Sequence, residues 1–122
     1  MNNLVLEFHE AFDLPIAEDE GHVLYLWRDL ITEESEEVDA AIAEYSVSPT
    51  PVNKAALLKE LADLQYVVNG MAVGLGLDLD EAFRRVHVSN MSKLVNGKPV
   101  FNEAGKVLKG PNYAPPNLSD LV

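Results

Sequence analysis

Residues 27–45, WRDLITEESEEVDAAIAEY, decide the fold that we expect for this chain. At 100° per residue, their apolar side chains fall within about 60° of Trp27 and form one stripe along a helix. This stripe consists of Trp27, Leu30, Ile31, Val38, Ala41, Ile42 and Tyr45. The pattern predicts a long amphipathic helix over residues 21–46, which the Pro49-Thr50-Pro51 turn ends.

Similar patterns predict three further helices, over residues 3–13, 53–73 and 79–94. We expect Asn53 to cap the third helix, and Gly70, Gly74 and Gly76 to loosen its far end. Asp78, with Glu81 three residues later, is close to a capping box for the fourth. Four amphipathic helices with short links predict an all-α, antiparallel four-helix bundle.

The whole chain, residues 1–122, is expected to be a single domain with a helical core over about 3–95 and a tail over 96–122. Within the tail, residues 100–101 and 106–108 flank a turn and predict a small hairpin. Gly110-Pro111 and Pro115-Pro116 predict a stiff, extended end.

Acidic residues fall where the helix of residues 21–46 should be apolar. Glu34 lies at about −20° from Trp27, in the middle of the stripe, and Glu37 at about −80°, on its edge. Glu33 lies on the flank at about −120°, whereas Glu36 lies opposite at about 180° and should be solvated.

The next helix repeats this anomaly. Its predicted stripe is Leu57, Leu61, Leu64, Val68 and Met71, with Glu60 on the edge and Asp63 one turn later. Buried carboxylates cost several kcal/mol unless they are paired or neutralised, and Mg²⁺ or Mn²⁺ matches a cluster of oxygen ligands. The sequence therefore predicts a divalent-metal site, with a solvated acidic face as the alternative.

Composition and motifs exclude several other classes. A net charge of −11 repels nucleic acid polymers and anionic membranes, and no apolar run is long enough for a transmembrane helix. Cysteine is absent, so a thiolate zinc site or a cysteine nucleophile is impossible, and a cytoplasmic location is expected. The chain has no P-loop motif, no Glu-x-x-His pair of a di-iron bundle and no complete EF-hand loop.

Two motifs resemble those of the MazG-like all-α nucleoside triphosphate pyrophosphohydrolases, which are related to all-α dUTPases and phosphoribosyl-ATP pyrophosphohydrolase. Glu33-Glu34-Ser35-Glu36-Glu37 matches the E-E-x-x-E pattern, and Glu60-Leu61-Ala62-Asp63 matches the E-x-x-D pattern on the following helix. The resemblance covers about residues 20–95, and the segments around residues 90–93 and 105–113 look like a compact single-domain branch.

The resemblance implies hydrolysis of a (deoxy)nucleoside triphosphate between the α and β phosphates, in nucleotide-pool control or house-cleaning. Glu34, Glu37, Glu60 and Asp63 would hold Mg²⁺, for which Mn²⁺ can substitute, with Glu34 also contributing to catalysis. Glu33 would hold a second ion or orient the attacking water. The resemblance also implies a homodimer or homotetramer.

Substrate contacts can be predicted from the basic half of the chain and from the aromatic residues. Asn90 and Lys93 share the apolar face of their helix, so Lys93 either binds a phosphate or extends its ammonium group to solvent. Lys106, Lys109 and Tyr113 either close over a bound nucleotide or are ordinary surface. Trp27 either contacts the base or packs in the core, and His9 either contacts the base or is a partly exposed helical histidine.

Two rivals to triphosphate hydrolysis remain. The same chemistry on phosphoribosyl-ATP would need more basic residues for the extra phosphate, and the chain has few arginines. A non-catalytic acidic helical module that binds a basic partner would tolerate glutamine at Glu34 and Glu60.

Overall fold

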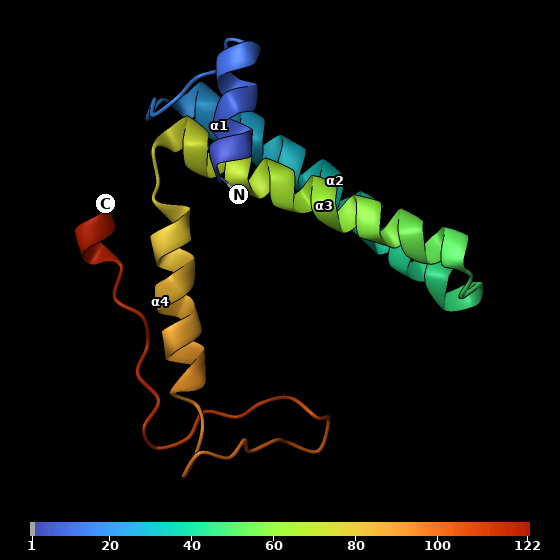
Figure 1. Cartoon of the computed structure of the whole chain (residues 1–122), viewed down its shortest axis with the longest axis vertical. Helices are drawn as coiled ribbons and strands as arrows, with labels where there is room; N and C mark the ends of the chain where they lie inside the picture. The colour runs from blue at the N-terminus through green and yellow to red at the C-terminus, as the bar shows by residue number, and fades with distance from the viewer. Residues whose placement is uncertain (1) are drawn as a thin grey trace. The chain divides into compact units, whose positions relative to one another are not determined.

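The computed structural model describes residues 2–122, and over this range the chain is all-helical, without strands, as predicted (Figure 1). Its helices are α1 (Asn2–Ala11), α2 (Gly21–Val47), α3 (Pro51–Leu75), α4 (Leu79–Met91) and a short 3₁₀ helix, η1 (Ser119–Leu121). Four α-helices agree with the predicted bundle class. The chain divides into two compact units, Met1–Leu77 and Asp78–Val122, which we describe one at a time.

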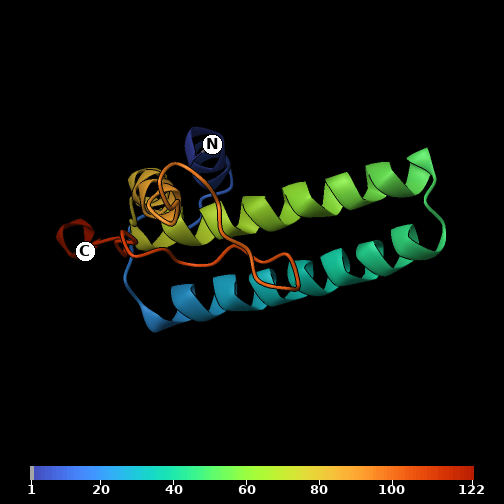
Figure 2. The same cartoon turned by 90° about the horizontal axis from the view of Figure 1, so that it is seen from below.

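In the first unit, α2 and α3 form a long antiparallel hairpin (Figure 2). Thr50 caps α3, because its side-chain oxygen accepts a hydrogen bond from the Asn53 backbone N–H at 3.2 Å, and Pro51 occupies the first turn. The prediction that Asn53 caps α3 is therefore wrong. The Asn53 amide instead donates to the carbonyl of Ser48 at 2.8 Å and braces the turn between the two helices.

Trp27 packs between the two helices near the open end of this hairpin. Its indole ring is only 4% exposed and lies against α3 at Gly70 and Gly74. Both glycines are buried inside the helix, so the expectation that they loosen its end is wrong. Gly76 alone of the three ends α3, with a left-handed φ of 70° that favours glycine.

The apolar stripes are confirmed in part. On α2, Trp27 and Val38 are buried, whereas Ile42 is 50% exposed. On α3, Leu61 and Val68 of the predicted stripe are exposed, and Asn69 and Ala72 are buried in their place. The buried face of α3 is therefore rotated from the predicted one, because small residues let it approach the Trp27 ring.

Helix α1 and the segment after it close one end of the hairpin. His9 of α1 is fully buried and stacks on Trp27, with 5.1 Å between ring centroids. After α1, the backbone N–H groups of Ala17 and Glu18 donate to the carbonyls of Val73 and Gly74 near the end of α3, at 3.0 and 2.8 Å. These bonds satisfy carbonyl groups that a helix end otherwise leaves without partners.

The second unit is α4 with the C-terminal segment. Asp78 caps α4 as predicted, accepting a hydrogen bond from the Glu81 backbone N–H at 3.2 Å. The helix ends at Met91, three residues before the predicted end. The predicted hairpin is present as a single antiparallel bridge between Phe101 and Val107, and the extended end then runs back along α4 (Figure 1).

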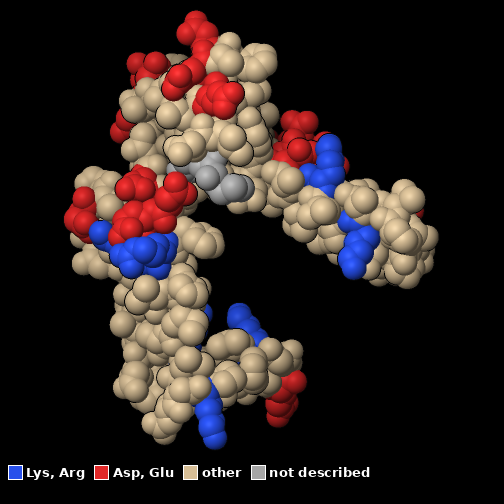
Figure 3. Space-filling view, in the orientation of Figure 1, with Lys and Arg blue, Asp and Glu red and all other residues tan. Residues whose placement is uncertain are grey.

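None of the helices in the described part of the chain is long and apolar enough to cross a membrane. In Figure 3, acidic side chains gather over α1 and the segment that follows it, whereas the hairpin part of the second unit shows mostly basic ones. This matches the sequence, in which residues 93–113 hold four lysines and one acid, Glu103.

Candidate metal centre

The pairing of α2 with α3 sets the positions of the acidic motifs. Trp27 meets Gly70 where the two helices approach closely. Seven residues further along α2 is Glu34, and seven residues back along α3 is Asp63. Since seven residues are about two helical turns, this antiparallel register brings the two motifs face to face.

The structure places four carboxylates together. One oxygen each from Glu34, Glu37, Glu60 and Asp63 lies within 4.8 Å of the others. Glu34, Glu60 and Asp63 are half-buried, whereas Glu37 lies at the exposed edge of the group. Glu33 and Glu36, the remaining acids of the first motif, are exposed and are not part of this group.

Two oxygen atoms of this carboxylate cluster are buried without a hydrogen-bond partner. They are Oε2 of Glu34 and Oε2 of Glu60, one from each helix. Burial raises the pKa of the Glu34 carboxyl, and hydrogen bonding and charge repulsion from Glu37 raise that pKa further, as do the charges of Asp63 and Glu60. A neighbouring cation would relieve both the missing hydrogen bonds and the repulsion.

Lys59, which the sequence motifs did not single out, places one positive charge beside the carboxylate cluster. Its ammonium group lies 2.7 Å from Oδ2 of Asp63 and 3.4 Å from Oε1 of Glu60, and its side chain is 66% exposed. These two carboxylates raise the pKa of Lys59, Asp63 first through its hydrogen bond. The spacing of Lys59 four residues before Asp63 is the signal from which this pair could have been found.

The donor set of the carboxylate cluster fits a hard divalent cation. All four groups offer oxygen, which Mg²⁺ and Mn²⁺ prefer. Oε2 of Glu34 and Oε2 of Glu60 accept no hydrogen bond, so both atoms are free to bind a cation. A second acidic group, Glu18, Glu20 and His22, has all of its members exposed, and the His22 ring pairs with Glu20 at 3.2 Å.

The aromatic residues predicted to contact the base are buried in the first unit. His9 and Trp27 stack on each other, and Nδ1 of His9 hydrogen-bonds to the carbonyl of Pro15 at 2.9 Å. Nε2 of His9 and Nε1 of Trp27 are buried without partners. In this structure both rings pack in the core, and their contact with a base stays a prediction.

The residues predicted to contact phosphate or to close over a nucleotide lie in the second unit. Asn90 and Lys106 are exposed, and Lys93 is half-buried near the end of α4. The ammonium groups of Lys93 and Lys109 lie 6.0 and 4.8 Å from the ring centroid of Tyr113. Three of the five residues therefore lie close together, Lys93 from the turn just after α4, and Lys109 and Tyr113 from the tail.

The described geometry defines an all-α protein that gathers four carboxylates from two antiparallel helices. The family model for phosphoribosyl-ATP pyrophosphohydrolase matches residues 5–90, a range that contains both acidic motifs. The chain belongs to this family, which is part of the MazG-like all-α nucleoside triphosphate pyrophosphohydrolases, and it is thereby a pyrophosphohydrolase. A comparison with curated proteins gives no significant match.

Proposed function

We propose that the chain hydrolyses a (deoxy)nucleoside triphosphate between the α and β phosphates, with Mg²⁺ held by the carboxylate cluster. The observation that carries this proposal is the pair of orphaned oxygens, from Glu34 and Glu60, inside a group of four acids. Clustered carboxylates without a cation are unstable, and a triphosphate cannot approach them alone because both carry negative charge.

Glu34, Glu37, Glu60 and Asp63 would hold the ion, which supplies charge neutralisation of the phosphate oxygens and a lower pKa for bound water. Glu33, on the flank of α2, orients the attacking water, and a carboxylate of the first motif accepts its proton. Water adds to one phosphorus, the bond to the bridging oxygen breaks, and pyrophosphate leaves. No covalent intermediate is needed.

Two alternatives are tested with the same assay. The name of the matched family favours phosphoribosyl-ATP as a second candidate substrate. The non-catalytic acidic module predicts no turnover of any nucleotide. Because the matched family is one of enzymes, the non-catalytic module is the less favoured of these two alternatives.

The decisive experiment measures pyrophosphate release from the eight common (d)NTPs and from phosphoribosyl-ATP, with Mg²⁺ and with Mn²⁺. We expect turnover of at least one (d)NTP, and a loss of about 10²–10⁴-fold in kcat for Glu60→Gln. The matched control is Glu36→Gln, which removes an exposed acid of the first motif and should keep kcat. Turnover of phosphoribosyl-ATP alone would overturn the substrate assignment, and no turnover at all would overturn the enzyme assignment.

We also propose that the chain acts as a homodimer or homotetramer. Val52 and Leu58, near the start of α3, are 77% and 68% exposed, and burial of such side chains against a second copy would stabilise an assembly. Light scattering coupled to size exclusion tests this, with Leu58→Ser expected to shift the mass toward the monomer.

A further inference from the structure

A two-residue turn, Asn96-Gly97, follows α4 and joins Val95 to Lys98. The backbone N–H groups of Val95 and Lys98 each donate to the carbonyl of the other residue, at 2.8 and 3.0 Å, so that the pair forms an antiparallel bridge. Both central residues have a positive φ, 51° for Asn96 and 73° for Gly97. Positive φ at both positions defines a type I′ turn, for which Asn-Gly is a preferred sequence.

The carboxamide of Asn96 is free to react with the backbone nitrogen of Gly97. Both residues are exposed, and a Cβ atom added at Gly97 would meet nothing within 4 Å. Among residues 2–122, neither the Gly97 N–H nor the Asn96 side chain has a hydrogen-bond partner. Because glycine has no side chain to hinder its nitrogen, an asparagine before it is especially prone to intramolecular attack.

This attack closes a succinimide ring, and the turn can adopt the backbone angle that the ring requires. The ring holds ψ of the asparagine at about −120°, the value for the first central residue of a type II′ turn. Types I′ and II′ share a positive φ at that residue and differ by a flip of the peptide bond between the two central residues. The flip gives Gly97 a negative φ, which glycine accepts without strain, and it keeps the bridge between Val95 and Lys98.

A second Asn-Gly pair, Asn69-Gly70, lies in a contrasting environment. It is inside α3, where Asn69 is only 6% exposed and the Trp27 ring covers Gly70. An interior helical N–H is bonded to the carbonyl four residues earlier, so a peptide flip there requires the helix to open. The same two residues are therefore protected at one place in the fold and reactive at the other.

We propose that Asn96 is a site of spontaneous deamidation, with the Gly97 nitrogen as nucleophile and water as the second reactant. The Gly97 nitrogen loses its proton and bonds to Cγ of Asn96, and the bond from Cγ to Nδ2 breaks and releases ammonia. Water then opens the succinimide at either of its two carbonyl groups, which leaves aspartate or isoaspartate. The turn lies beyond the matched residues 5–90 and contains none of the four carboxylates of the proposed metal centre.

The isoaspartate product disturbs the packing of the C-terminal segment. It inserts a methylene group into the backbone, so the two-residue turn no longer fits between Val95 and Lys98. Cγ2 of Val95 lies against Gly110, only 2.5 Å from where a Cβ atom would be, so a shift of Val95 reaches the segment that passes the end of α4. Both products also add one negative charge to a chain whose net charge is −11.

The test incubates the full chain in its native state at pH 7 and at pH 9, and peptide mapping by mass spectrometry follows each asparagine. We expect Asn96 to convert at least about tenfold faster than Asn69, because α3 must open before Asn69 reacts. Conversion should be faster at pH 9, since the attacking nitrogen must lose its proton. In urea, which removes the fold, the rates of the two Asn-Gly pairs should become equal.

The matched variant is Asn96→Gly, because glycine accepts the same positive φ and lacks the carboxamide. It should form no isoaspartate in this segment. Anion exchange separates the deamidated chain, and the amide shift of Gly110 should change in the isoaspartate fraction but not in Asn96→Gly. Equal native rates at Asn96 and Asn69, or an Asn96 that reacts only in urea, would overturn the site. An unchanged Gly110 shift in the isoaspartate fraction would overturn its structural effect.

Discussion

The indole ring of Trp27 lies directly over the backbone of Gly70, so that a Cβ atom at this glycine would come within 2.6 Å of Cη2 of the indole. This contact brings α2 and α3 together two turns from the point where Glu34 faces Asp63. It therefore sets the register on which the carboxylate cluster depends, although neither residue has a ligand atom of its own in the cluster.

Gly70→Ala should destabilise the first unit by about 1–3 kcal/mol, because the added methyl group overlaps a buried ring and overpacks the core. The better helix propensity of alanine offsets only about 1 kcal/mol of this. Urea unfolding measures the change. Gly21→Ala is the matched control, since a Cβ atom there meets nothing within 4 Å. Equal stability of the two variants would show that the contact does not set the register.

The sequence was sufficient to predict the helices and the meeting of the two acidic motifs, because both follow from the 3.6-residue period. Glu34, Glu37, Glu60 and Asp63 were placed on facing margins by angle alone, and they do converge. The same angles placed Glu36 outward, where it is exposed.

What the sequence could not show depends on close packing between segments. Gly70 and Gly74 suggested a weak helix end because the partner ring of Trp27 is remote in sequence. His9 gave no sign of full burial, since its stacking partner lies on another helix. The tail was expected to be extended, but its docking depends on the pairing of Arg85 with Asp120 across 35 residues.

Mg²⁺ should raise the melting temperature of the wild-type chain by several degrees. An ion that binds only the folded state adds about 2.7 kcal/mol to the free energy of unfolding at 100 times its Kd. Glu34→Gln should abolish this response and yet raise the melting temperature without metal, because it removes a buried charge that lacks a partner. A thermal-shift titration checks both changes. A variant that is less stable without metal and still responds to Mg²⁺ would contradict the assignment.

Lys59→Met should tighten Mg²⁺ binding by up to about fivefold, because it removes a cation that pairs with Asp63 and Glu60. The exposed position of Lys59 keeps this effect small, since solvent screens the pair. Calorimetric titration with Mg²⁺ measures the change. Lys54→Met is the control, as it removes an exposed charge from the same helix. Weaker binding in the Lys59 variant would instead assign this lysine a supporting role in the metal centre.

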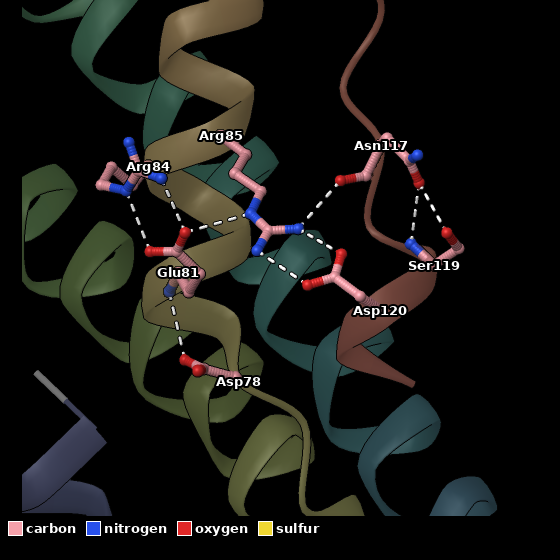
Figure 4. A network of polar contacts seen from close by, with 7 residues as sticks. All are labelled: Asp78, Glu81, Arg84, Arg85, Asn117, Ser119 and Asp120. Atoms are coloured by element: carbon pink, nitrogen blue, oxygen red, sulfur yellow. Dashed lines mark hydrogen bonds and ion pairs between the residues drawn. The ribbon is translucent and has the colours of Figure 1, made fainter.

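Acid should release the C-terminal segment from α4 only below about pH 4. Hydrogen bonds from Arg84 and then Arg85 lower the pKa of Glu81 to about 2, and Arg85 lowers the pKa of Asp120. The arginines that pair with Glu81 belong to its own helix (Figure 4), so its pKa stays lowered when the tail is undocked, whereas Asp120 then titrates at its ordinary value of about 3.9. Because docking lowers the pKa of Asp120, this acid stabilises the docked tail above that ordinary value. That contribution is lost as the pH falls through the lowered pKa.

Amide shifts of residues 114–121, followed from pH 7 to pH 2, measure this release. They should stay constant down to about pH 4.5 and then change as the Asp120 carboxylate takes up a proton. Asp120→Asn should already show part of the change at pH 7, because it removes one acceptor pair of Arg85. Release of the wild-type tail between pH 7 and pH 5 would mean that a group other than Asp120 holds it, and the importance of the Arg85–Asp120 pair would be contradicted.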